Sequence, residues 1–143
     1  MTIRKQEFYE GAALHRLSSS VSVIFRYASP FFILNDRLWV LLKYCTKGRS
    51  PWNFTFTAQE QAQLQTQASA CSVVLGLICG DDGIAAIDID SYFGVAALSG
   101  SAVHVACFRG HGEYYEISGP DGVMAKKVSP SRWECILSQE DGK

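Results

Sequence analysis

The chain has 143 residues, of which 48% are hydrophobic and 12% aromatic, and its formal net charge is −1. This length predicts one domain over residues 1–143 with a single substantial core, and the apolar content excludes an intrinsically disordered chain. The charge is unevenly divided: residues 1–57 hold eight basic and three acidic side chains, or +5, whereas the remainder carries −6. Such a chain can present a basic face to an anion, unless folding brings the two halves together and cancels the field.

The chain begins with charged residues, and no run approaches the ~18 apolar residues needed to span a bilayer. We therefore expect a cytoplasmic protein without membrane contact. The five cysteines are scattered and include no C-x-x-C pair. This pattern argues against a disulfide framework and against a structural zinc site, so we expect buried, reduced thiols.

The first half of the chain predicts a helix followed by three antiparallel strands. The helix covers residues 3–18, and the strands cover 21–27, 31–34 and 38–44, with turn residues at 35–36. The last strand is an almost unbroken apolar run, which is typical of a strand covered on both faces. We therefore expect it at the centre of the sheet.

The second half predicts another helix and a series of hairpins. Thr57 and Glu60 have the spacing of a reciprocal capping box, which opens a helix over about 57–68. The predicted strands are 72–79, 84–90, 102–108, 113–118 and 122–128, with a connection at 91–101 and a short strand or helix after Pro130. The fold class is thus α+β, with a mixed, mostly antiparallel sheet, two helices and a C-terminal β-meander.

Positive charge gathers where the central strand ends. Lys43 belongs to the strand itself, and Lys47 and Arg49 follow in a loop that contains Gly, Ser and Pro. A buried ammonium costs several kcal/mol unless it is paired or reaches water. Lys43 is therefore expected to have an acidic partner or to open into a cleft; the alternative is a side chain that reaches solvent at the strand end. Loops held by rigid strands often carry binding sites.

Other motifs carry less weight. Neither a G-x-G-x-x-G nor a P-loop motif occurs, and no G-x-S-x-G element supports a catalytic serine. His104, Cys107 and His111 span eight residues, but the first two point to opposite faces of a strand, which disfavours a metal site. The acids between Asp81 and Asp90 match no EF-hand loop. A turn with a charged outer face explains them better than a divalent metal.

The order helix, three antiparallel strands, helix and apolar strand resembles the core of the PD-(D/E)xK, or restriction-endonuclease-like, family. In that family, acids of the first helix and second strand and an E-x-K motif on the third strand hold Mg²⁺ for phosphodiester hydrolysis. The resemblance implies Glu10 or Glu7 as the helix acid, Asp36 as the strand acid and Lys43 as the motif lysine, with Mg²⁺ as cofactor of a working site. Leu41 stands where the motif glutamate belongs, so the implied core is degenerate.

Two classes of function follow. In the first, the protein binds nucleic acid. The residues expected to contact phosphates are Arg37, Lys43, Lys47 and Arg49, and those expected to stack on bases are Trp52 or Phe54. In the second, it is a non-catalytic homo-oligomer or partner-binding module, which the high apolar content favours. An enzyme that binds a small anionic metabolite with the same loop is a weaker third alternative.

Overall fold

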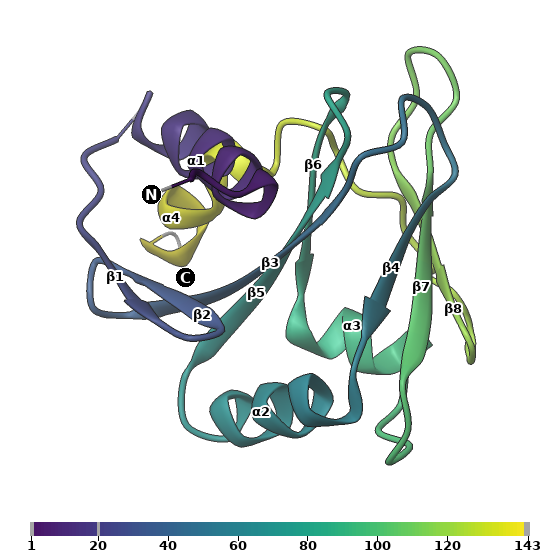
Figure 1. Ribbon diagram of the computed structural model, residues 1–143. Helices are drawn as coiled ribbons and strands as arrows, with labels where there is room; N and C mark the ends of the chain where they lie inside the picture. The colour runs from purple at the N-terminus through teal and green to yellow at the C-terminus, as the bar shows by residue number, and fades with distance from the viewer. Residues whose placement is uncertain (1, 20, 142–143) are drawn as a thin grey trace.

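The computed structural model describes residues 2–19 and 21–141 and has two β-sheets (Figure 1). The first sheet has the strand order β1-β2-β3-β5-β6: β1 (Phe25–Ala28), β2 (Phe31–Leu34), β3 (Leu38–Cys45), β5 (Ser72–Cys79) and β6 (Gly83–Asp88). The second has the order β4-β7-β8-β9: β4 (Trp52–Phe56), β7 (Val103–Phe108), β8 (Glu116–Gly119) and β9 (Gly122–Val123). Only β3 and β5 pair in parallel; all other pairs are antiparallel.

Helices cover one face of the five-stranded sheet and one end of the space between the two sheets (Figure 1). They are α1 (Lys5–Ser18), α2 (Ala58–Ala68), α3 (Ile89–Val95), the 3-10 helix η1 (Trp133–Cys135) and α4 (Ile136–Asp141). The helices α1, η1 and α4 lie on one face of the five-stranded sheet, where Leu17 of α1 and Trp133 of η1 join its buried side chains. The other face packs against the four-stranded sheet, and α2 and α3 contribute Leu64 and Tyr92 to that second core. This architecture confirms the α+β class.

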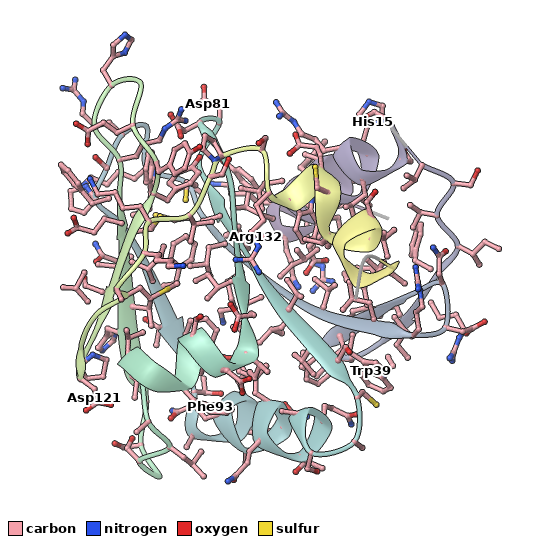
Figure 2. All side chains as sticks on the ribbon, turned by 180° about the vertical axis from the view of Figure 1, so that it is seen from behind. His15, Trp39, Asp81, Phe93, Asp121 and Arg132 are labelled. Carbon is pink, nitrogen blue, oxygen red and sulfur yellow. The ribbon has the colours of Figure 1, made fainter. Side chains whose placement is uncertain are left out.

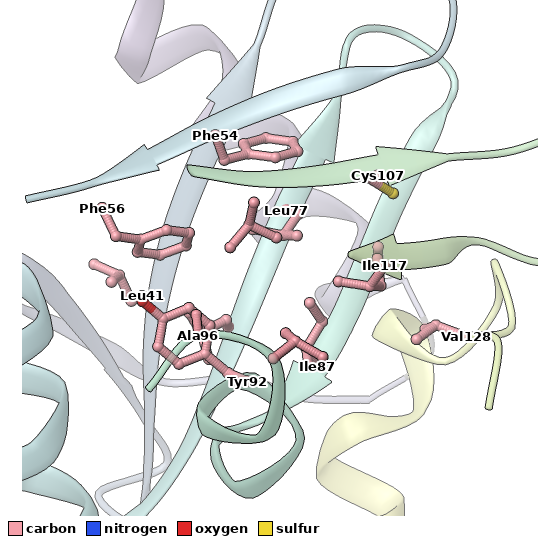
Figure 3. Close-up of a cluster of buried hydrophobic side chains, with 14 of the residues drawn as sticks. Leu41, Phe54, Phe56, Leu77, Ile87, Tyr92, Ala96, Cys107, Ile117 and Val128 are labelled. Carbon is pink, nitrogen blue, oxygen red and sulfur yellow. The ribbon is translucent and has the colours of Figure 1, made fainter. Parts of the chain in front are cut away.

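The predicted central strand is β3, the third of five strands. Its side chains alternate between two cores: Val40 and Leu42 pack on the side of α1, and Leu41 packs on the side of the second sheet. Figure 3 shows side chains of both sheets meeting in the latter core. Because both faces are covered, an apolar run without alternation is the pattern that this position requires.

Several boundaries differ from those predicted. The strand predicted at 84–90 ends at Asp88, because the Asp88 carboxylate accepts a hydrogen bond from the Ser91 backbone N–H at 3.1 Å and opens α3. The region predicted as a connection therefore contains a helix. The first strand is only Phe25–Ala28 and is largely exposed, since it lies at the edge of the sheet.

The strands also divide into two sheets where one was expected. The segment after Pro51 leaves the first sheet, and Phe54 pairs with Val105 of β7. The predicted meander is present, but its last strand is short, and the later part of that segment contributes a single bridge between Tyr115 and Val128. Among residues 2–19 and 21–141, no helix combines the length and apolar character needed to cross a bilayer.

Candidate functional site

Lys43 forms an ion pair with a carboxylate that the second helix supplies. Its Nζ lies 3.0 Å from both carboxylate oxygens of Glu60, and each side chain is 21% exposed. The ammonium also lies over the Phe56 ring, 5.4 Å from its centroid. The expected acidic partner therefore exists, but it is neither Glu10 nor Asp36.

Glu60 is held in place by the capping box predicted from the sequence. Its backbone N–H donates to the Thr57 hydroxyl at 3.1 Å, and its carboxylate accepts from the Thr57 backbone N–H at 2.9 Å. The same carboxylate thus closes the start of α2 and neutralises Lys43. The signal that points to it is a lysine within an apolar strand, which needs an acid, together with a helix that begins directly after β4 and has a glutamate in its first turn.

The ion pair lies in a groove of about 560 Å³ between α1, the end of β3, β4 and the start of α2. We call it the lysine groove. Gln6 and Glu10 of α1, Pro30, and Asn53 and Thr55 of β4 also line it. Gln6 Nε2 donates to Glu10 Oε2 at 2.9 Å. The structure thus brings the predicted helix acid and the predicted lysine into one groove.

Part of the lysine groove is an open strand edge. β2 pairs with β3 only as far as Leu41, so the stretch 42–45 has no strand beside it on that side among the described residues. These residues line the groove. Unpaired edge N–H and C=O groups can bond to a ligand, so the groove offers backbone donors and acceptors as well as side chains.

A neutral phenol lies in the core near the ion pair. Tyr92 of α3 is 1% exposed, and its ring centroid lies 5.0 Å from that of Phe56 (Figure 3). Its hydroxyl has no hydrogen-bond partner among the described residues. Burial, with the negative charge of Glu60 as a smaller cause, raises the pKa of Tyr92 to about 12. The sequence held no signal for this residue, because its segment was predicted as a connection.

Asp36 and Arg37 do not belong to the lysine groove. Both are exposed and lie in the turn before β3, whereas Lys43 lies near the opposite end of that strand. The eight residues of β3 span roughly 23 Å at the usual rise of a strand. Asp36 instead accepts a hydrogen bond from Arg26 Nε at 3.2 Å. The predicted set of Glu10, Asp36 and Lys43 is therefore not assembled.

The loop between β3 and β4, residues 46–51, carries Lys47 and Arg49, and we call it the basic loop. Both side chains are exposed, and neither has an acidic partner among the described residues. Trp52, by contrast, is 2% exposed and donates its Nε1–H to the Lys47 carbonyl at 2.9 Å. Phe54 is equally buried. Neither ring can stack on a base, which corrects the prediction from the sequence.

The backbone of the basic loop is held by the neighbouring turn. Gly80 has φ +56°, its N–H donates to the Cys45 carbonyl at 2.8 Å, and a Cβ there would collide with the Lys47 carbonyl. Ser50 Oγ donates to the Arg109 carbonyl at 3.2 Å. The loop therefore presents its two cations from a fixed backbone next to the lysine groove.

The other residues considered from the sequence serve the fold. His104 is exposed, with Nδ1 3.0 Å from Thr55 Oγ1, whereas Cys107 is buried with its Sγ 3.6 Å from that of Cys79. All five cysteines are free, as expected, but only Cys79 and Cys107 are buried: Cys45 and Cys71 are half-buried, and Cys135 is exposed. Asp82, in the acidic turn, accepts hydrogen bonds from the Tyr115 hydroxyl at 2.6 Å and from Arg109 Nη1 at 2.9 Å.

The donor set does not fit the Mg²⁺ site of a PD-(D/E)xK nuclease. Across residues 2–19 and 21–141, no three His, Cys, Asp or Glu side chains lie close enough together to hold a metal ion. The carboxylates that line the lysine groove are Glu10 and Glu60, and Glu60 is already bound to Lys43. The motif position at Leu41 is an apolar side chain that is 1% exposed.

No protein-family model, no curated protein and no solved structure matches this chain. Its function is therefore inferred from the lysine groove, the basic loop and their surroundings.

Proposed function

We propose that the protein binds nucleic acid through the basic loop and the adjoining lysine groove, without cleaving it. The observation that supports this proposal is the state of Lys47 and Arg49. Both are exposed, and neither has an acidic partner among the described residues. Cations that protrude from a fixed backbone are suited to binding phosphate oxygens, because the backbone loses little conformational freedom when they bind.

Lys43 has a different role from these two cations. Glu60, at 3.0 Å, neutralises its charge, so Lys43 lines the groove as part of an ion pair. The cations of the basic loop make the phosphate contacts. Arg37 lies beyond the far end of β3 and does not extend this surface. Neutralising two phosphates lowers log affinity by about 0.7 to 0.9 per phosphate for each tenfold rise in salt. Affinity should therefore fall about tenfold between 50 and 200 mM salt through the loop alone.

Binding without hydrolysis agrees with the residues of the groove. A nuclease of the family that the element order resembles needs carboxylates on the second and third strands next to its lysine. Here Leu41 fills one of those positions, and Asp36 lies at the other end of β3. We therefore propose that a degenerate nuclease-like core serves as a binding scaffold.

The test is fluorescence anisotropy with a labelled 20-nucleotide DNA strand at 50 mM salt. The variant Lys47→Ala/Arg49→Ala should lower the affinity about tenfold or more. Lys126→Ala/Lys127→Ala is the control, because these side chains are also exposed but lie after β9; of the two, Lys127 has an acidic neighbour, Glu113, at 3.6 Å. It should bind like the wild type. A wild-type protein that does not bind at 50 mM salt, or equal losses in both variants, contradicts the proposal.

A specific observation favours a second function, association through the N-terminal part of the chain. Large apolar side chains are strongly exposed on and around α1 and β1: Ile3, Phe8, Ile24, Phe25 and Tyr27. The outer edge of β1 also has no strand beside it among the described residues. Exposed apolar surface beside an open edge is typical of a contact with another chain. Light scattering that shows a monomer at every concentration would exclude self-association.

A further inference from the structure

A second groove lies between α2 and strands β2 and β3, and we call it the glutamine groove. Its volume is about 420 Å³. Its lining combines two aromatic rings with amide and hydroxyl groups: Ala28, Ser29, Phe31, Trp39, Gln59, Ala62, Gln63, Thr66 and Gln67. Not one of these described residues is charged. The groove thus suits a neutral ligand with a flat face and a polar rim.

The amides come from one side of a regular helix. Gln59, Gln63 and Gln67 follow each other at intervals of four residues on α2, so they form one row. The Gln67 side chain accepts a weak contact from the Cys71 thiol, whereas the side-chain amides of Gln59 and Gln63 make no hydrogen bond to the other described residues. Each free amide offers two N–H donors and a carbonyl acceptor. That is the complement of the edge of a heterocyclic base.

Trp39 supplies the flat surface (Figure 2). It is partly exposed, and the Phe31 ring meets it edge-on, at 69° with 5.4 Å between the centroids. The other tryptophans, Trp52 and Trp133, are 2% and 0% exposed. Stacking on an aromatic side chain accepts any base, because every base has a π-face. Trp39 therefore takes the role that the sequence had suggested for Trp52.

The glutamine groove lies near the lysine groove. Pro30 and Glu60 line the lysine groove, and their neighbours in the chain, Ser29 and Gln59, line the glutamine groove. Residues 39 and 43 lie on one face of β3, separated by about 13 Å. The two sites are therefore close enough for one flexible strand to reach both.

We propose that the glutamine groove binds an unpaired nucleobase, stacked on Trp39 and hydrogen-bonded by Gln59 and Gln63. This inference rests on the proposed function and narrows it, because the nucleic acid is then single-stranded. Bases within a duplex are stacked on each other and expose no face to a protein ring. The phosphates engage the basic loop, and a base that follows turns into the groove.

Two DNA strands of equal length separate base contacts from phosphate contacts. The first is a 12-nucleotide oligothymidylate, and the second is an abasic strand with the same backbone. Trp52 and Trp133 are buried, so Trp39 is the tryptophan that a base can contact, and a change in emission that Trp39→Leu abolishes reports on it. Oligothymidylate should quench the emission, and the abasic strand should bind through its phosphates without quenching. A 12-base-pair duplex should also leave the emission unchanged.

Substitutions test the same contacts through affinity. Trp39→Leu should bind oligothymidylate at least about fivefold more weakly, the lower limit for one lost base stack. It should bind the abasic strand as the wild type does, and its remaining emission should no longer respond to oligothymidylate. Gln63→Ala changes only a partly exposed helix position, so it covers the case in which Trp39→Leu does not fold. It too should weaken oligothymidylate binding and spare the abasic strand.

The outcomes separate this inference from the proposed function. Salt-dependent binding that is equal for oligothymidylate, abasic strand and duplex, and unaffected by Trp39→Leu, overturns the base site and leaves the nucleic-acid proposal in place. If no strand binds at 50 mM salt, the proposed function fails. Thymidine at millimolar concentration then decides the base site alone. Quenching in the wild type but not in Trp39→Leu supports it, and no quenching overturns it.

Discussion

The ion pair between Lys43 and Glu60 should contribute measurably to stability, because it is partly withdrawn from water. Exposed pairs contribute about 0.2–1 kcal/mol, and removal of one partner of a fully buried pair costs about 3–5 kcal/mol. Both side chains here are 21% exposed, and both carboxylate oxygens contact the ammonium at 3.0 Å. We therefore expect Lys43→Met and Glu60→Gln each to lower the free energy of unfolding by about 1–2 kcal/mol.

The double variant isolates the pair itself. Lys43→Met/Glu60→Gln should cost less than the sum of the single changes, with a coupling free energy of about 1 kcal/mol. Gln can keep the capping contact to Thr57, so the cap contributes little to the difference. Urea unfolding at pH 7, followed by circular dichroism, gives the four free energies.

A matched pair on the surface provides the control. Arg26 and Asp36 lie 3.2 Å apart, but their side chains are 63% and 76% exposed. The cycle Arg26→Met/Asp36→Asn should give a coupling below about 0.5 kcal/mol. If both cycles give the same small coupling, the Lys43–Glu60 pair is solvated like any surface pair, and the reasoning about the groove is wrong.

Three further changes test the network around the site. Tyr115→Phe removes a 2.6 Å hydrogen bond to Asp82 and should lower the free energy of unfolding by about 1.5–3 kcal/mol in urea titrations. Tyr92→Phe removes a hydroxyl that has no partner among the described residues, so it should leave the free energy of unfolding unchanged. Because burial raises the pKa of Tyr92 to about 12, the folded state keeps this proton to a higher pH than the unfolded state does, so this group should cost about 2 kcal/mol of stability between pH 10 and 12, and Tyr92→Phe should lose less. Gly80→Ala should lower the Tm by several degrees, through its φ of +56° and the collision with the Lys47 carbonyl.

Local patterns were sufficient to predict the centre of the fold. The apolar run at Leu38–Tyr44 indicates a strand covered on both faces, and β3 is in fact flanked by two cores. Thr57 and Glu60 form the capping box that their spacing indicates. In both cases the physical cause lies within a few residues of the chain, so the sequence displays it directly.

Long-range packing decided what the sequence did not show. The sequence around Trp52 predicts a loop, in which the ring would be free to stack on a base. In the structure Trp52 begins β4 and pairs with Cys107, and its ring is buried. Tyr92 lies in a segment with Gly and Ser that reads as a connection, although the helix there buries one side in the core. The ion pair of Glu60 with Lys43 depends on the packing of α2 against the face of β3 that carries Lys43, which no local pattern displays.

The most direct test of the central claim is the salt dependence of DNA binding by the wild type and by Lys47→Ala/Arg49→Ala. The account predicts that log affinity for a single strand falls with log salt concentration, and that the variant lowers the magnitude of this slope by about 1.4, the value for two phosphate contacts. A wild-type slope near zero, or a slope that both proteins share, would contradict the proposal that the basic loop binds nucleic acid.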